Sequence, residues 1–338
     1  MTHFRNATRD INDPNCGLPI DTIAENVFVN CFEFRVGEPS VELSIEIPEP
    51  KEVWPTLRTR DGGNPNERNE LLFNILVTNG IDSIPNYELD IEIEFADSSG
   101  GHQHSDPGYP NNLRGTLTDS LTNQSQVGSI ITSSNQNGLI FLKYISNQSS
   151  GKFIITARST SESLSISDTI TVKVPNLLQF GEIGSYTLTG ETINHVNNHY
   201  LINQQAINSL LGASSAFGNS KWNTSGEMRL NDMSLEWGGL FDISGQWRTP
   251  HNSHRTGRDV DIENISARDT TLMVLDPVTG IIRERTVLVF ESDWIENYRV
   301  LMQLRNWFFV DEGQNNPNRN PINDQPGIRY PHFNWRGN

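Results

Sequence analysis

Alternating hydrophobic and polar residues predict β-strands through the first half of the chain. The segments SVELSIEI (40–47) and YELDIEIEF (87–95) place apolar side chains at every second position, which is the period of a half-buried strand. The apolar run LLFNILVTNG (71–80) ends in Asn-Gly, a turn signal. Similar short runs follow between clusters of Gly, Asn and Ser: GLIFLKYI (138–145), GKFIITARS (151–159) and SDTITVKV (167–174). Short strands at this spacing predict an antiparallel β-sandwich.

The pattern changes after VPNLLQFGEIG (174–184), which we interpret as a linker. The segment LINQQAINSLLGASSAF (201–217) carries apolar residues at helical spacing and predicts a helix. A second helix is predicted over 292–309, with Ser292 as its N-cap. Strands are predicted at MRLNDMSL (228–235), TLMVLD (271–276) and RTVLVF (285–290). A mixture of helices and strands predicts an α+β second half.

We therefore expect a multidomain protein, an all-β Ig-like sandwich followed by an α+β domain. The expected boundaries are an irregular N-terminal segment over 1–42, the sandwich over 43–176 and the α+β domain over 177–338. The total of 338 residues is long enough for two or three domains.

Charge and composition narrow the classes of partner. The formal net charge is −16, which argues against nucleic acid or an anionic membrane surface, because both attract Lys and Arg patches. No apolar run approaches the roughly 20 residues that a membrane-spanning helix needs. The first residues, MTHFRNATRD, contain no apolar signal-peptide core. Cys16 and Cys31 could form one disulfide or remain free thiols, and two cysteines are too few for a Cys-rich zinc site.

The densest group of candidate metal ligands is in TPHNSHRTGRDVDI (249–262), where His254 and Asp261 stand in an H-x-x-G-x-x-x-D pattern. Zinc accepts imidazole and carboxylate ligands, and Gly257 allows a tight turn between the two. If DVDI is a strand, Asp259 and Asp261 share one face while Val260 faces the other side. By spacing alone the pattern is weak, and a solvated loop His followed by an Asp at a strand end is the more ordinary interpretation.

The segment PHNSHRTGRDVDI resembles the first metal motif of the penicillin-insensitive murein endopeptidases, in the zinc peptidase group that includes D-alanyl-D-alanine peptidases and hedgehog domains. The resemblance implies that His254 and Asp261 are zinc ligands and that His251 and Gly257 support them. The upstream segment NDMSLEWGGLFDISGQW (231–247) resembles bacterial proteins in which an Ig-like domain precedes such a peptidase domain. The segment NQNGLIFLKYISNQSSGKFIITARS (135–159) resembles the ends of bacterial Ig-like domains.

The third ligand departs from the pattern of this group, which ends in H-x-H. The corresponding segment here is PHFNWRGN (331–338), so His332 matches the first His and Asn334 replaces the second, which binds zinc in the family. In a shifted register His332 would be the ligand and Tyr330 would take the assisting catalytic position. Since residues 330, 332 and 334 share one face of a strand, we expect His332 to be the third ligand, with Asn334 or Tyr330 assisting.

The resemblance implies one Zn²⁺ per chain and hydrolysis of peptide bonds, in peptidoglycan cross-links, by metal-activated water. It also implies a secreted or periplasmic protein whose leader is absent from this numbering. Arg248 is a candidate for binding a substrate carboxylate. The general base is not assigned, since Glu291 and Asp293 are more typical of a helix N-terminus than of a base.

Two further histidine pairs are weaker candidates for metal binding. His102 and His104, with Asp106, are in GGHQHSDPGYP (100–110), which is more typical of a polar loop tip than of a metal site. His195 and His199 have i, i+4 spacing, but the Asn residues around them argue against a helix and hence against a zinc pair.

A second function remains open beside hydrolysis. The C-terminal domain could be catalytically degenerate, keeping the peptidase fold, with or without metal, and serving binding or adhesion. Asn334 and the unassigned base favour this alternative, whereas the intact His254, Gly257 and Asp261 favour the enzyme. The two hypotheses share one geometric requirement for metal binding, namely that His254, Asp261 and His332 meet in space.

Overall fold

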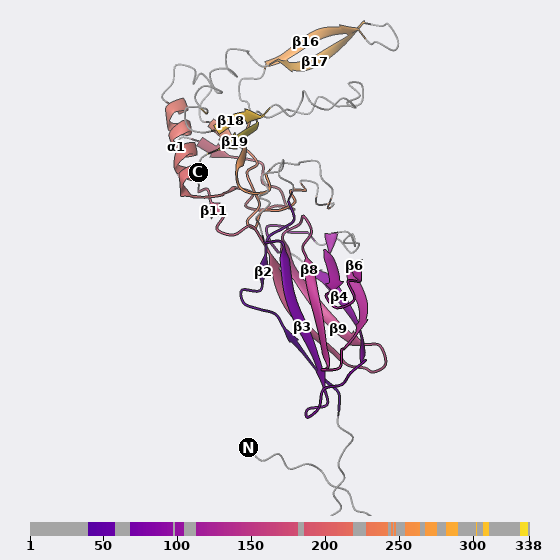
Figure 1. Cartoon of the computed structure of the whole chain (residues 1–338). Helices are drawn as coiled ribbons and strands as arrows, with labels where there is room; N and C mark the ends of the chain where they lie inside the picture. Colours follow the sequence, from indigo (N-terminus) through magenta and orange to yellow (C-terminus); the bar gives the residue numbers. More distant parts are fainter. Residues whose placement is uncertain are drawn as a thin grey trace, which may run out of the picture.

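Among the residues that it describes, a computed structural model of the chain contains many β-strands and one α-helix (Figure 1). The structure describes residues 40–57, 68–96, 99–104, 113–181, 186–218, 228–242, 245, 247, 254–263, 268–275, 282–289, 302, 307–310 and 332–336. The predicted N-terminal segment, including Cys16 and Cys31, lies outside these residues apart from its last positions.

The first half forms two five-stranded sheets. One sheet has the order β1-β3-β8-β5-β6, made by Glu42–Glu46, Glu70–Thr78, Leu139–Ile145, Thr116–Asp119 and Ser125–Val127. The other has the order β2-β10-β9-β4-β7, made by Glu52–Val53, Ser165–Val172, Gly151–Ser159, Glu88–Ala96 and Ser129–Ser133. All pairs are antiparallel except β2 with β10. The alternation in the sequence therefore predicted this part of the architecture.

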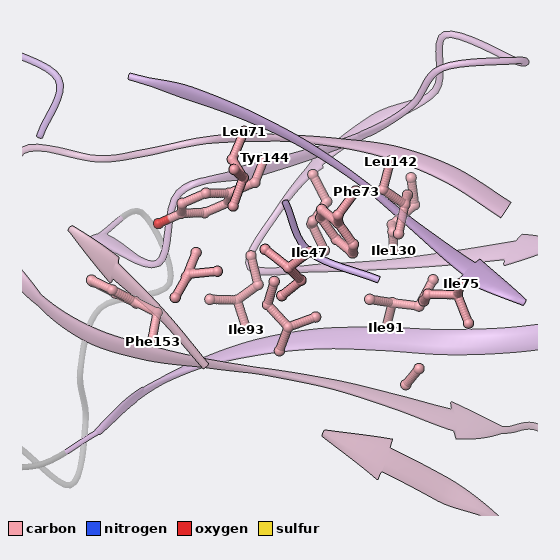
Figure 2. Close-up of a cluster of buried hydrophobic side chains, with 14 of the residues drawn as sticks. Ile47, Leu71, Phe73, Ile75, Ile91, Ile93, Ile130, Leu142, Tyr144 and Phe153 are labelled. Atoms are coloured by element: carbon pink, nitrogen blue, oxygen red, sulfur yellow. The ribbon is translucent and has the colours of Figure 1, made fainter. Parts of the chain in front are cut away.

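The core of these two sheets comes from the alternating apolar positions of their strands. Ile75 and Val77 of β3, Ile91 and Ile93 of β4 and Phe153 of β9 are at most marginally exposed. Figure 2 shows the side chains of this cluster gathered between the ribbons of the two sheets. Because each buried position alternates with a more exposed one, the sheets pack as a sandwich with polar outer faces.

The second half contains a sheet with the order β12-β14-β15-β19-β18. Its strands are Tyr186–Leu188, Met228–Leu230, Asp259–Glu263, His332–Trp335 and Trp307–Val310. Helix α1, Gln204–Gly218, shares a second buried core with this sheet through Leu210 and Phe217. Two smaller ladders complete the described elements: β11 (Leu178–Gln179) with β13 (Tyr200–Leu201), and β16 (Arg268–Leu275) with β17 (Ile282–Val289).

The start of α1 has a local cause. Asn203 accepts a hydrogen bond from the backbone N–H of Ala206 through its side-chain oxygen, at 2.9 Å. This bond satisfies one of the N–H groups that a helix leaves without an intrahelical partner. The predicted helix began two residues before this cap, so the prediction was right about the element and wrong only at its start.

The segment from Trp237 to Trp247 joins the two halves. Trp237 accepts a hydrogen bond from the N–H of Val174 at 2.9 Å, and Leu240 donates one to the carbonyl of Gln148 at 2.8 Å. The hydroxyl of Ser150 donates to the carbonyl of Gly238 at 2.6 Å. Leu240 and Trp247 also belong to the buried core of the sandwich. The sandwich is therefore in direct contact with the loops that precede the His254 motif.

Two sequence predictions need correction. Trp307, Phe308 and Phe309 form most of strand β18 rather than the end of a helix over 292–309; of the rest of that segment only Met302 is described, and it is helical. Their aromatic spacing fits either period over so short a run, and pairing with β19 decides for the strand. The expected linker, 174–184, contains β11 and the buried Phe180, so part of it belongs to the second core.

Candidate metal centres

The His254 motif is a tight turn that leads into strand β15. Both His254 and Gly257 have left-handed backbone conformations, with φ of 65° and 69°. A Cβ on Gly257 would lie 2.7 Å from the backbone nitrogen of Ile202, so the turn requires glycine for space as well as for φ. The N–H of His254 donates to the Asp259 carboxylate at 3.2 Å. A non-glycine residue in this conformation is uncommon and is held here by its surroundings.

His254 and Asp261 meet inside the protein. The Nε2 of His254 lies 3.4 Å from Oδ2 of Asp261, and the two side chains are 0% and 8% exposed. The separation is close to the ~3.3 Å between two ligand atoms on a tetrahedral zinc ion with bonds of about 2.0–2.1 Å.

The neighbouring strand β19 places residue 332 opposite Asp261. In the antiparallel ladder between β15 and β19, Asp261 is paired with His332 and Asp259 with Asn334. Directly opposite residues in such a ladder have Cβ atoms about 4.5–5.5 Å apart. Between these pairs, Val260 is paired with Phe333, and both are buried in the second core. The register thus brings residue 332 beside the His254–Asp261 pair, and residue 334 beside Asp259.

A third carboxylate, Asp232, stands close to this pair. Asp232 is 6% exposed, its Oδ1 accepts a hydrogen bond from Asn198 at 2.7 Å, and its carbonyl accepts the N–H of Asp261. The pKa of Asp232 is raised to about 6, mainly by burial; His254 lowers this pKa, and the charge of Asp261 raises it. Three carboxylates, Asp232, Asp259 and Asp261, are therefore buried around one histidine, a donor set that fits a divalent cation.

The remaining predicted site residues are not all described. Tyr330, His251 and Arg248 lie outside the described residues, as do Glu291 and Asp293. His332 and Asn334 are described as members of strand β19. The structure therefore brings together His254, Gly257, Asp261 and the strand position of His332.

A second cluster joins four side chains from distant segments. His102 and His104 follow strand β4, His195 precedes β13, and Asp242 belongs to the segment Trp237–Trp247 that joins the two halves. One ligand atom from each lies within 4.8 Å of the others. Oδ1 of Asp242 is 2.9 Å from Nε2 of His195, 3.3 Å from Nδ1 of His102 and 3.6 Å from Nε2 of His104.

The side chains of this cluster are largely buried, and their surroundings shift the pKa values of Asp242 and His102. Burial raises the pKa of Asp242, but contacts with the three histidine rings outweigh it and hold the pKa well below its ordinary value. For His102, burial lowers the pKa more than the neighbouring Asp242 raises it, and the other two histidines lower it further. Asp242 is thus a carboxylate and His102 a neutral imidazole near neutral pH.

Two aromatic rings, Trp247 and Phe241, contact histidines of the second cluster. The Trp247 ring centroid lies 4.6 Å from those of His102 and His104. Phe241 stacks on His195 at 5.8 Å and contacts the ring of His254 at 5.6 Å. Each candidate centre therefore has a histidine in contact with the ring of Phe241.

The sequence analysis did not connect the two histidine pairs of the second cluster. It grouped His102 and His104 with Asp106, which is outside the described residues, and paired His195 with His199. His199 instead contacts the Thr189 carbonyl through Nε2 at 2.8 Å. No local pattern singles out Asp242. The two histidine pairs were visible in the sequence, but the contact between them depends on the junction of the two halves.

Within the described part of the chain, no helix is both long and apolar enough to span a bilayer.

No family model matches the sequence, and no curated protein matches it. Among solved structures, the D0-D1 domain of intimin is similar over 40% of this chain and 49% of its own, at 11% identity and a TM-score of 0.25. This chain thus matches about half of that structure.

Two other solved structures are similar at the same level. A conjugative transposon lipoprotein from Bacteroides eggerthii is 12% identical over 40% of this chain and 98% of its own, with a TM-score of 0.23. A C-terminal intimin fragment, solved with the intimin-binding domain of its translocated receptor, is 12% identical over 45% of this chain and 43% of its own, with a TM-score of 0.23.

Proposed function

We propose that the chain is a zinc-dependent hydrolase of peptide bonds, acting on peptidoglycan cross-links. One observation carries the proposal: the β15–β19 register pairs Asp261 with His332, while His254 lies 3.4 Å from Asp261. Of the three residues that the murein endopeptidase resemblance assigns to the metal, His332 is far in the sequence from His254 and Asp261. A ladder that pairs His332 with Asp261 is what a zinc site made of His, Asp and His requires.

Each residue of the proposed site has its own role. His254, Asp261 and His332 hold the ion and leave a further coordination position open, as in catalytic zinc sites. Zinc bound there would polarise the scissile carbonyl and bring the pKa of a bound water towards about 7. Gly257 shapes the turn that presents His254.

Asp232 is the candidate for accepting a proton from water. It is the buried carboxylate that interacts electrostatically with both His254 and Asp261. Asn198 donates a hydrogen bond to one of its oxygens at 2.7 Å and so orients the carboxylate. A general base must lie within hydrogen-bond reach of the proton it abstracts, directly or through one water, and Asp232 lies beside two of the proposed ligands, His254 and Asp261.

The β-sandwich would act as a spacer or a binding module of a secreted or periplasmic enzyme. Its two-sheet architecture fits the Ig-like domain that the resemblance implies. Its hydrogen bonds to the segment 237–240 would hold the hydrolase domain at a set orientation.

A binding protein with a degenerate site is the second candidate function. The observation that favours it is the pairing of Asn334 with Asp259. In the resembled family this position is a zinc-binding His, and a neutral amide oxygen is a poor substitute. Such a protein would keep the fold and bind peptidoglycan peptides without cleaving them.

Digestion of purified peptidoglycan separates the two functions. Zinc-loaded wild type is expected to release cross-link fragments that mass spectrometry can identify, and a chelator should stop release until zinc is restored. His254→Ala and Asp261→Asn should be inactive while keeping the far-ultraviolet circular dichroism of the wild type. If zinc-loaded wild type cleaves nothing but still co-sediments with peptidoglycan, the hydrolase proposal is wrong and the binding protein is favoured.

A further inference from the structure

The four side chains His102, His104, His195 and Asp242 do not belong to the proposed hydrolytic site. They form a separate group, and the ring of Phe241 contacts both His195 of this group and His254 of the proposed hydrolytic site. Two of the four follow a strand of the sandwich, and the other two belong to the second half of the chain.

Their spacing matches a tetrahedral ion. Four ligand atoms about 2.0–2.1 Å from a zinc ion are ~3.3 Å apart. The three histidine nitrogens are 2.9, 3.3 and 3.6 Å from Oδ1 of Asp242. Small adjustments of these side chains would complete the coordination, since all four ligand atoms are already within 4.8 Å of one another.

Unsatisfied ring nitrogens provide an independent observation. Among the described residues, both nitrogens of His102 and both of His104 are buried without a hydrogen bond of acceptable geometry, as is Nδ1 of His195. His102 and His195 are 0% and 1% exposed. Buried polar groups without partners are costly and uncommon. Nδ1 of His102 and Nε2 of His104 face Oδ1 of Asp242 beside Nε2 of His195, which contacts that oxygen at 2.9 Å. Two unpartnered ring nitrogens around one carboxylate oxygen indicate a site for an ion that accepts nitrogen lone pairs.

The carboxylate is held in place by its neighbour. Its second oxygen, Oδ2, accepts the backbone N–H of Trp247 at 2.6 Å. Such a contact behind a ligand fixes its orientation. The cluster also draws together backbone segments that already touch, since the N–H of Gln103 donates to the carbonyl of Asn194 at 2.8 Å.

We propose that His102, His104, His195 and Asp242 bind a structural zinc ion that fastens the sandwich to the second half of the chain. Four protein ligands fill the tetrahedron, which is the arrangement of a closed structural site rather than a catalytic one. Imidazole and carboxylate donors in a small tetrahedral site favour zinc over Mg²⁺ or Ca²⁺, which take more ligands and prefer oxygen. The ion stabilises the orientation of the two halves and takes no part in hydrolysis.

Zinc titration of metal-free full-length protein tests the proposal in a His254→Ala background, which removes the hydrolytic site. Calorimetric titration with Zn²⁺ alone should show a stoichiometric tight site. Adding Asp242→Asn, which keeps the side chain's size, should weaken that binding at least tenfold, and adding His195→Ala should abolish it. His199→Ala is the matched control, because His199 is also buried, at 2% exposure, but contacts the Thr189 carbonyl instead; it should keep the site.

Hydrogen exchange tests zinc binding without relying on ligand variants that could fail to fold. Zinc added to the His254→Ala protein should slow amide exchange in residues 99–104 and 237–242, leaving the sandwich strands β3 and β4 unchanged. Absence of tight zinc binding in folded His254→Ala protein would overturn the proposal, as would undiminished binding after Asp242→Asn. A failure of peptidoglycan cleavage would leave it standing, since the structural ion does not depend on hydrolysis.

Discussion

Asp261 and His332 face each other across the ladder between β15 and β19, although 70 intervening residues separate them in the sequence. The pairing supports His332 as the proposed third ligand, whereas Asn334 lies two residues further along the strand, opposite Asp259. A substitution that tests this register must therefore compare the two positions.

We expect His332→Ala to lose peptidoglycan cleavage by more than ~100-fold, because even groups that only orient a zinc ligand are worth about 10–100-fold. Asn334→Ala should retain activity within about threefold, since the residue next to Asp259 holds no ion. The measurement is the rate of fragment release at saturating zinc. The opposite ranking of the two variants would assign the metal to residue 334.

Gly257→Ala should destabilise the protein by about 1–3 kcal/mol, the usual cost of a strained backbone position. Its φ of 69° disfavours any side chain, and a Cβ would lie 2.7 Å from the backbone nitrogen of Ile202. Gly181→Ala is the matched control, because nothing lies within 4 Å of a Cβ there. Urea unfolding of both variants provides the comparison; equal stabilities would show that the turn does not need glycine.

Asn203→Ala should cost about 1 kcal/mol of folding free energy through loss of the N-cap of α1. The side-chain oxygen of Asn203 accepts the N–H of Ala206 at 2.9 Å, and alanine offers no acceptor. Asn203→Asp keeps the acceptor and should remain near wild-type stability. Denaturant unfolding measures both, and an equal loss in the two variants would point to a role for Asn203 other than capping.

Asp119 should make the sandwich less stable in acid. Burial raises its pKa, but hydrogen bonds from Thr132, Thr122 and Leu121 outweigh burial and leave the pKa below 3.8. A carboxyl with a lowered folded pKa contributes stability that is present above its unfolded pKa and is lost as the pH falls through the folded value.

The contribution of Asp119 is therefore complete at pH 7 and declines below about pH 4. Asp119→Asn should lower stability at pH 7 and flatten the fall in stability between pH 5 and pH 3. The exposed Glu162 provides the control variant, Glu162→Gln, which should keep the wild-type profile. The measurement is the free energy of unfolding across this pH range. Parallel profiles for wild type and Asp119→Asn would contradict the stabilising role of the Asp119 carboxylate.

The local sequence pattern was enough to predict the elements that follow long periodic runs of residues. Strands β3, β4, β9 and β10 follow alternating or apolar runs of eight or nine residues, and α1 follows a clear helical stripe. Strand β18 was not predicted, because four aromatic and apolar residues carry no period and only pairing with β19 defines them.

The candidate sites differ in the same way. His254, Gly257 and Asp261 are in one short segment, so a motif predicts them together. His102 and Asp242 meet because the segment Trp237–Trp247 packs against the sandwich, and no spacing within the sequence encodes that contact. Sequence analysis therefore identified the histidines of the second cluster only as isolated pairs.

Elemental analysis of zinc in the purified protein, after zinc loading and removal of excess, tests the central claim most directly. The His254–Asp261–His332 site and the His102–His104–His195–Asp242 site together predict about two zinc ions per wild-type chain. His254→Ala and His332→Ala should each reduce the content to about one. Unchanged zinc in folded His254→Ala and His332→Ala proteins, or none in the wild type, would contradict the hydrolytic zinc site.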